Sequence, residues 1–167
     1  ISDLKIFDAA NDSVDIDFSD GAIKNLYIFN SGNDGIDFSN STVDIENIVI
    51  NDAKDKCISI GEESTIKIIS MSINNCYIGI AIKDSSKLEI NGNLNSNANE
   101  YDIATYIKKN IFGSSEIKIN TSNLPKLNVL SEEGSELFIN GDKFKNNSLN
   151  TYNQLYWNEI WNKICYK

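Results

Sequence analysis

A short apolar pattern recurs along the first half of this chain, in which one residue lies between two large apolar ones. Its four copies begin 20, 22 and 22 residues apart. The apolar residues of each copy are two positions apart, which is the spacing of side chains on one face of a half-buried strand. A unit this short cannot bury its apolar face alone, so successive units must stack. The copies are Ile16-Asp17-Phe18, Ile36-Asp37-Phe38, Ile58-Ser59-Ile60 and Ile80-Ala81-Ile82.

Each copy is followed by a polar turn, a second alternating strand and a third apolar segment. Three strands in each unit of about 22 residues predict an all-β fold, a right-handed, single-stranded parallel β-helix (a β-solenoid) of about six coils. A helical repeat would need an apolar period of 3.6 residues, whereas the observed period is 2. The predicted core contains Ile16, Phe18, Ile36, Phe38, Ile58, Ile60, Ile80 and Ile82.

The composition suits such a solenoid, with 27 isoleucines and 25 asparagines among 167 residues. β-Branched isoleucine packs well inside strands. Asparagine tolerates the left-handed backbone of a corner and can hydrogen-bond from one coil to the next. The codons of an AT-rich genome favour the same residues, so the prediction depends on their order rather than on their numbers.

The tail has a different period. Leu149, Tyr152, Tyr156, Ile160 and Ile164 are spaced by three or four residues, which predicts an amphipathic helix over 148–167 with Ser148 as its N-cap. We therefore divide the chain into a β-helix over 1–147 and a helix that caps the exposed end of the solenoid. The alternative is a helix that docks on a partner.

The three cysteines have no metal-site spacing, and the chain contains no histidine to complete a zinc site. A disulfide between Cys57 and Cys76 is one reading of their spacing. Half-buried free thiols at Cys57, Cys76 and Cys165 are the expectation.

The charge excludes two classes of partner. Residues 1–63 carry a net charge of −10 and residues 64–167 a net charge of +1, without a single arginine. Nucleic acid and anionic membranes both need a basic surface, so neither is an expected partner. No apolar stretch approaches the roughly 20 residues of a transmembrane helix, so no membrane insertion is expected.

Several phrases of the sequence resemble the pectin-lyase-like superfamily of right-handed β-helices. They are most similar to β-helix regions of large bacterial surface or spore-coat (CotH-like) proteins, over roughly residues 14–120. The pattern departs at Cys57, where those proteins usually have glycine, and at Asn110, where they have proline. The resemblance implies the fold and carries no residue-by-residue activity. The phrases are SGNDGID at 31–37, DKCISIGE at 55–62, IGIAIKDSS at 78–86 and YIKKNIFG at 106–113.

Enzymes of that superfamily act on acidic polysaccharides with arginine or histidine, and this chain has neither. A glycosidase that uses two carboxylates is the remaining catalytic option. Alternation places Asp17 and Asp37 outward, one coil and about 5 Å apart. Such a pair could be catalytic, could bind Ca²⁺, or could be a solvated acidic stripe, which is the expected outcome. The acids considered are Asp15, Asp17, Asp34, Asp37, Asp44 and Asp55.

These observations predict a non-catalytic structural or binding module of a larger, surface-associated protein, located outside the cell or at its surface. Its partner would be a polysaccharide or a protein, with Asp17, Asp37 and Tyr77 as candidate contacts. Outward tyrosines such as Tyr27, Tyr77 and Tyr101 could stack on sugar rings. No cofactor is expected unless the aspartates bind Ca²⁺. The alternatives are a carbohydrate-active enzyme, or a fragment of one whose catalytic coils lie outside this chain, and a self-associating solenoid.

Overall fold

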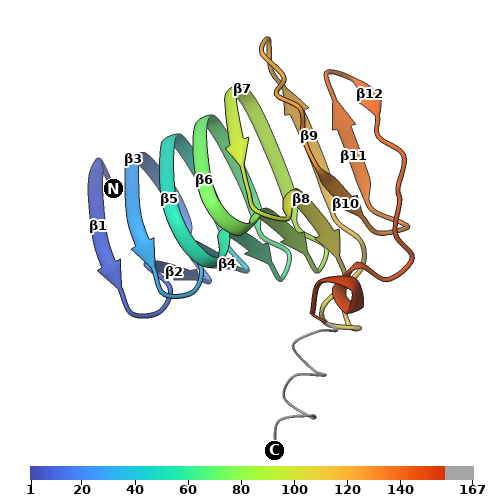
Figure 1. Ribbon diagram of the computed structural model, residues 1–167, viewed down its shortest axis with the longest axis horizontal. Coiled ribbons are helices and arrows are strands. Elements are labelled where there is room, and N and C mark those ends of the chain that lie inside the picture. The colour runs from blue at the N-terminus through green and yellow to red at the C-terminus, as the bar shows by residue number, and fades with distance from the viewer. Residues whose placement is uncertain (157–167) are drawn as a thin grey trace, which may run out of the picture.

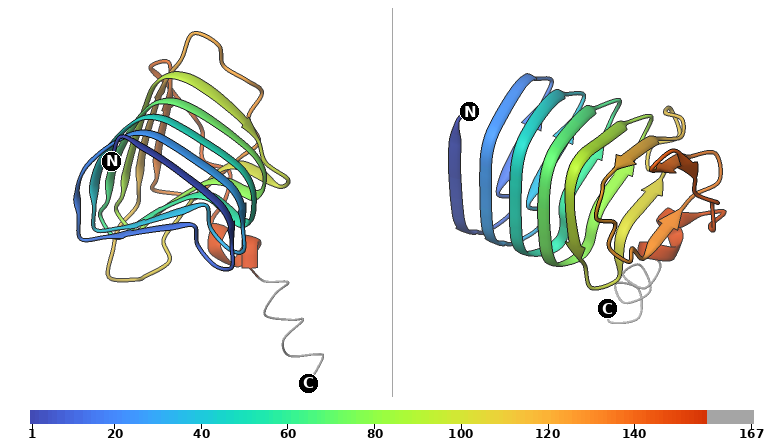
Figure 2. Two further views of the ribbon diagram at one scale, coloured as in Figure 1. Left: turned by 90° about the vertical axis from the view of Figure 1, so that its left-hand side faces the viewer. Right: turned by 90° about the horizontal axis from the view of Figure 1, so that it is seen from above.

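The computed structural model describes residues 1–156 as a parallel β-solenoid of about six turns (Figure 1). A view along its axis shows a roughly triangular outline (Figure 2). The strands are β1 Asp3–Ala9, β2 Val14–Asp17, β3 Asp20–Ser31, β4 Ile36–Ser39, β5 Thr42–Gly61, β6 Thr65–Lys83, β7 Lys87–Asn97, β8 Tyr101–Tyr106, β9 Glu116–Asn120, β10 Val129–Ser131, β11 Glu136–Ile139 and β12 Asp142–Lys143.

Three walls of parallel strands enclose the core, as the sequence predicted. In the first wall, β1 pairs with the second half of β3, and the wall then continues through parts of β5, β6 and β7. The first part of β3 begins a second wall that ends in β9 and β11. The third wall, which we call the lateral wall, contains β2, β4, the ends of β5 and β6, β8 and β10. Because β5 and β6 bend at corners, each contributes to all three walls.

Columns of aliphatic side chains fill the interior, and the predicted stacking is confirmed. Phe38, Ile60 and Ile82 are register partners in successive coils. All three are 0% exposed, as are Ile36, Ile58 and Ile80 in the neighbouring column. Full burial of each such side chain contributes about 2–3 kcal/mol to the free energy of folding.

The first copy of the repeat is placed differently from the prediction. Ile16, not Phe18, is the register partner of Phe38, so the step is 22 residues here as well. Phe18 follows the end of β2, has a φ of 47° and is 78% exposed. Its counterpart 22 residues later is Asn40, which has a φ of 48°. The prediction of Phe18 as a core residue was therefore wrong, because Phe18 lies at a corner.

Asparagine and aspartate have the predicted role at the corners. Asp8, Asn30, Asp52 and Asn75 have φ values of 56°, 63°, 66° and 56° and follow one another along one corner. The adjacent position carries a ladder of amides. Asn74 donates to Asn51 at 2.9 Å, and Asn97 donates to Asn74 at 2.7 Å. Hydrogen bonds between coils therefore accompany apolar packing in holding the coils in register.

At the C-terminal end of the solenoid the chain covers its own strand edge and core. β12 pairs antiparallel with the edge of β11, and Phe144 packs against the end of the core. The helix predicted over 148–167 is described for residues 151–156, which lie against the outside of the lateral wall (Figures 1 and 2). There Leu155 contributes to a separate apolar cluster.

The start of this helix also differs from the prediction. Asn150 rather than Ser148 is the N-cap, because its Oδ1 accepts the Asn153 N–H at 3.1 Å. Leu149 is 83% exposed and does not belong to the apolar side of the helix. The predicted apolar positions Ile160 and Ile164 lie outside the described residues.

Candidate functional site on the lateral wall

The outward side of the lateral wall changes in character along the solenoid axis. One outward column runs through register partners in six successive coils. Carboxylates occupy it at the N-terminal end, a serine follows, and small or apolar side chains occupy it beneath the C-terminal helix. The column consists of Asp15, Asp37, Ser59, Ala81, Ala104 and Leu130.

The acidic pair differs from the predicted one. Asp15 is the register partner of Asp37, whereas Asp17 is paired with Ser39. The expected adjacency of Asp17 and Asp37 was therefore wrong, for the same reason as the placement of Phe18. Burial, followed by the charges of Asp17, Asp37 and Asp12, raises the pKa of Asp15. Within residues 1–156 no group of three or more acidic, cysteine or histidine side chains could hold a metal ion.

A buried lysine neutralises the second of these carboxylates. Lys83 reaches back across two coils, where its Nζ lies 3.6 Å from Asp37 Oδ1 and donates to Ser59 Oγ. Gly61 provides the space for this path, since a Cβ there would lie 2.8 Å from Lys83 Cε. Burial lowers the pKa of Lys83, and the charge of Asp37 opposes that shift.

An amine with a lowered pKa beside a serine hydroxyl is an arrangement that can activate a nucleophile. Here Ser59 is 0% exposed, and Lys83 is also buried. A substrate carbonyl therefore has no path to Ser59 Oγ in this conformation. The contact instead joins three successive coils through Asp37, Ser59 and Lys83.

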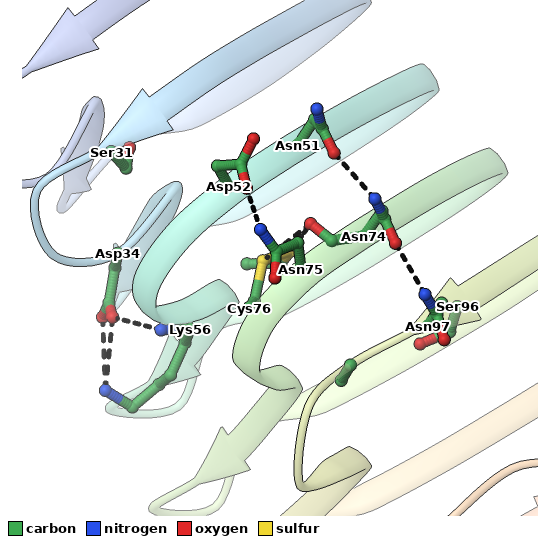
Figure 3. Close-up of a disulfide and its surroundings, with 12 residues drawn as sticks. Ser31, Asp34, Asn51, Asp52, Lys56, Asn74, Asn75, Cys76, Ser96 and Asn97 are labelled. Carbon is green, nitrogen blue, oxygen red and sulfur yellow. Dashed lines mark hydrogen bonds and ion pairs between the residues drawn. A yellow bond between two sulfur atoms is a disulfide. The ribbon is translucent and has the colours of Figure 1, made fainter.

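A second buried lysine, Lys56 in β5, forms a similar link between coils. Lys56 Nζ lies 3.3 Å from Asp34 Oδ1 and also contacts the Asp55 carboxylate, while Asp34 Oδ1 accepts the Lys56 backbone N–H at 3.0 Å (Figure 3). Lys56 Nζ lies 5.8 Å from the centre of the Tyr156 ring, so the helix contacts this pair through a cation–π interaction.

Burial and the neighbouring charges both shift the pKa values of this pair. Burial lowers the pKa of Lys56, but Asp34, Tyr156 and Asp55 outweigh it, and the pKa is raised overall. Burial raises the pKa of Asp34, and Asp55 and Asp37 add to that shift against the opposing effects of Lys56. One ammonium group thus serves more than one carboxylate.

Substitution of Asp34 by asparagine tests this electrostatic account. Asparagine keeps an oxygen that can accept the Lys56 N–H. Because the folded protein raises the pKa of Asp34, it binds that proton more tightly than the unfolded chain does. The stabilisation from protonation is complete at a pH below the pKa that Asp34 has in the unfolded chain. It is lost as the pH rises through the pKa that Asp34 has in the folded protein. We expect the free energy of unfolding of the wild type, minus that of Asp34→Asn, to increase as the pH falls from 7 to 4 in urea titrations. A decrease would contradict the direction of the shift.

Five tyrosines gather at the C-terminal side of the lateral wall. Tyr106 is buried between the wall and the helix, with ring centres 5.8 Å from Tyr152 and 6.4 Å from Tyr156. Burial raises the pKa of the Tyr106 phenol well above its usual value. Tyr77 and Tyr101 are half-buried and pack against the same cluster.

Two of the three predicted tyrosines therefore share one surface. Tyr27 lies on a different wall, with Lys5 Nζ 5.4 Å above its ring. The sequence analysis placed Tyr152 and Tyr156 on the apolar side of a helix but did not group them with Tyr106, because the three meet only when the tail folds back on the coils. The aromatic residues at regular spacing in 152–156 were the available signal.

The cysteines differ from the expectation of half-buried free thiols. Cys57 and Cys76 form a disulfide with a Cα–Cα distance of 5.5 Å, and both are fully buried (Figure 3). The bond joins β5 to β6 beside the corner of Asp52 and Asn75. Cys165 lies outside the described residues.

No helix within residues 1–156 combines the length and apolar character needed to cross a bilayer.

Comparisons with protein families, with curated proteins and with solved structures find no match for this chain. The fold itself supports the resemblance to β-helix proteins at the level of architecture, because it is a parallel β-solenoid with coils of about 22 residues.

Proposed function

We propose that this chain is a non-catalytic β-solenoid module of a larger, surface-associated protein, and that its lateral wall contacts a glycan or a protein. One observation carries the proposal. The buried lysines of this wall are paired with its aspartates across coils, so the groups most suited to chemistry hold the coils together. The exposed parts of Tyr77 and Tyr101 provide rings that can stack on a sugar or pack against a protein.

Two further observations support a surface location. A disulfide is typical of proteins that fold in oxidising compartments or outside the cell. The phrases that resemble CotH-like and pectin-lyase-like β-helices favour a bacterial surface protein of that superfamily as the parent molecule. The net charge of −9 favours a neutral glycan over a polyuronate, which it would repel.

The catalytic part of the proposal is tested by incubating the protein with pectate, alginate and neutral glucans. We expect neither unsaturated products nor new reducing ends. Activity that disappears in Asp37→Asn would overturn the non-catalytic assignment.

The binding part is tested by electrophoresis through gels that contain the same neutral glucans. If the tyrosine cluster contacts sugar, we expect retardation of the wild type and its loss in Tyr101→Ala. Tyr27→Ala is the matched control, because Tyr27 lies on another wall, and it should be retarded like the wild type. Equal retardation of all three proteins would exclude the cluster as the glycan contact.

A carbohydrate-active enzyme is the second candidate, and the register of Asp15 and Asp37 favours it. Neighbouring strands are about 5 Å apart, which is the carboxylate separation of retaining glycosidases. The raised pKa of Asp15 would suit a general acid. Loss of a measured activity in both Asp15→Asn and Asp37→Asn would establish this alternative.

A further inference from the structure

The N-terminal end of the solenoid has strand edges that the described chain does not use. β1 pairs with β3, and β2 pairs with β4, on one side only within residues 1–156 (Figure 1). The other side of each strand presents its backbone N–H and C=O groups. Such an edge is a template for another strand.

The core is also open at this end. Leu4, Ile6, Val14 and Ile16 are only partly buried. Their register partners one coil further on are Leu26, Ile28, Ile36 and Phe38, which are all 0% exposed. The same four columns are therefore complete in the second coil and lack a covering layer above the first. Another coil would supply that layer.

The corner side chains indicate what this layer must contain. Asp3 accepts a hydrogen bond from Asn25 at 2.7 Å, and Asp8 accepts one from Asn30 at 2.8 Å. A carboxylate only accepts hydrogen bonds, so a coil on the outer side would need donors at these positions. Residues 1–22 contain six aspartates and one lysine, a net charge of −5, which likewise favours amide or ammonium groups.

The opposite end provides the contrast. There the edge of β11 is paired with β12. The edge of β10 is covered by the segment at 147–148, where Ser131 O accepts the backbone N–H groups of Asn147 and Ser148, both at 3.0 Å. Coils can therefore be added at the N-terminal edge but not beyond β11 or β10 without displacing these residues.

We propose that the N-terminal edge docks a further parallel β-coil that carries amide or ammonium side chains opposite Asp3 and Asp8. This inference rests on the proposed role as a module of a larger protein. A second copy of this chain does not fit the edge. Two such edges related by a two-fold axis would pair antiparallel, and each would bring a net charge of −5 against the other.

The test is an added coil. Copying residues 23–44 directly before Ile1 places Asn25 and Asn30 opposite Asp3 and Asp8, and the apolar residues of the copy above the open columns. We expect hydrogen exchange of the outward amides of β1 and β2 to slow by about 100-fold or more. In a matched graft whose copy carries Asn25→Asp and Asn30→Asp, the protection should be clearly weaker.

Two results would overturn the proposal. One is unchanged exchange in β1 and β2 of the grafted protein. The other is a light-scattering mass of twice 18.7 kDa for the unmodified chain that returns to the monomer value in Val14→Lys, because the occupant would then be a second copy. Neither result depends on glycan binding or catalysis, so failure here is distinguishable from failure of the proposed function.

Discussion

Replacing Ile60 with aspartate is expected to lower the free energy of unfolding by about 4 kcal/mol or more. Ile60 is 0% exposed and stacks between Phe38 and Ile82 in a column whose first four members, from Ile16 to Ile82, are large apolar residues. The substitution removes apolar burial from this column and places a carboxyl group where apolar side chains surround it. Ionised, the carboxylate would be unpaired in the core, and protonated, it would still lack hydrogen-bond partners.

Urea titration followed by circular dichroism measures this loss. Ile69→Asp is the matched control, because Ile69 is 57% exposed on β6 and the same change there should shift the free energy of unfolding by less than about 0.5 kcal/mol. A loss for Ile60→Asp no larger than that for Ile69→Asp would mean that the inward and outward positions of the lateral wall are wrongly assigned.

The interior of the fold was predictable because alternation and stacking constrain each other. Within Ile36-Asp37-Phe38 and its later copies, only one assignment puts both large apolar residues in the core. The first coil allowed two assignments, since Val14-Asp15-Ile16 and Ile16-Asp17-Phe18 both alternate. The shared sequence Ile-Asp-Phe favoured the second assignment, whereas the 22-residue step that the next two coils keep on this wall selects the first. A register taken from corner positions would have placed Phe18 with Asn40 rather than with Phe38.

The candidate site was less predictable, because its contacts cross coils and do not follow the repeat. Lys83 reaches back two coils to Asp37, and a long flexible side chain has no periodic signature. Tyr156 meets Tyr106 from 50 residues away, with hydroxyl oxygens 3.4 Å apart. The tail was recognised as a helix from its spacing, but the spacing does not show which surface the helix covers.

The disulfide was named from the sequence only as an alternative to free thiols, for a related reason. Cys57 and Cys76 are 19 residues apart, so they are not equivalent positions of a 22-residue repeat. In the structure Cys76 is the register partner of Ala53, and the register of β5 and β6 shifts between Ala53 and Lys56. The corner turns the chain between these positions and brings Cys57 back towards Cys76. A pairing that depends on a corner cannot be derived from strand periodicity alone.

Removal of this disulfide should have the second large effect on stability. The bond closes a loop with a sequence separation of 19, and such a cross-link stabilises a protein by about 3 kcal/mol, chiefly by restricting the unfolded chain. We expect Cys57→Ala/Cys76→Ala, made in a Cys165→Ala background that prevents thiol exchange, to lose about that amount relative to the background protein in urea titrations. The background protein should lose a similar amount when it is reduced before refolding, whereas the double variant should not respond to reductant. Equal stability of the double variant and the oxidised background protein would show that Cys57 and Cys76 are not bonded in solution. The support that the disulfide gives to a location outside the cell would then be withdrawn.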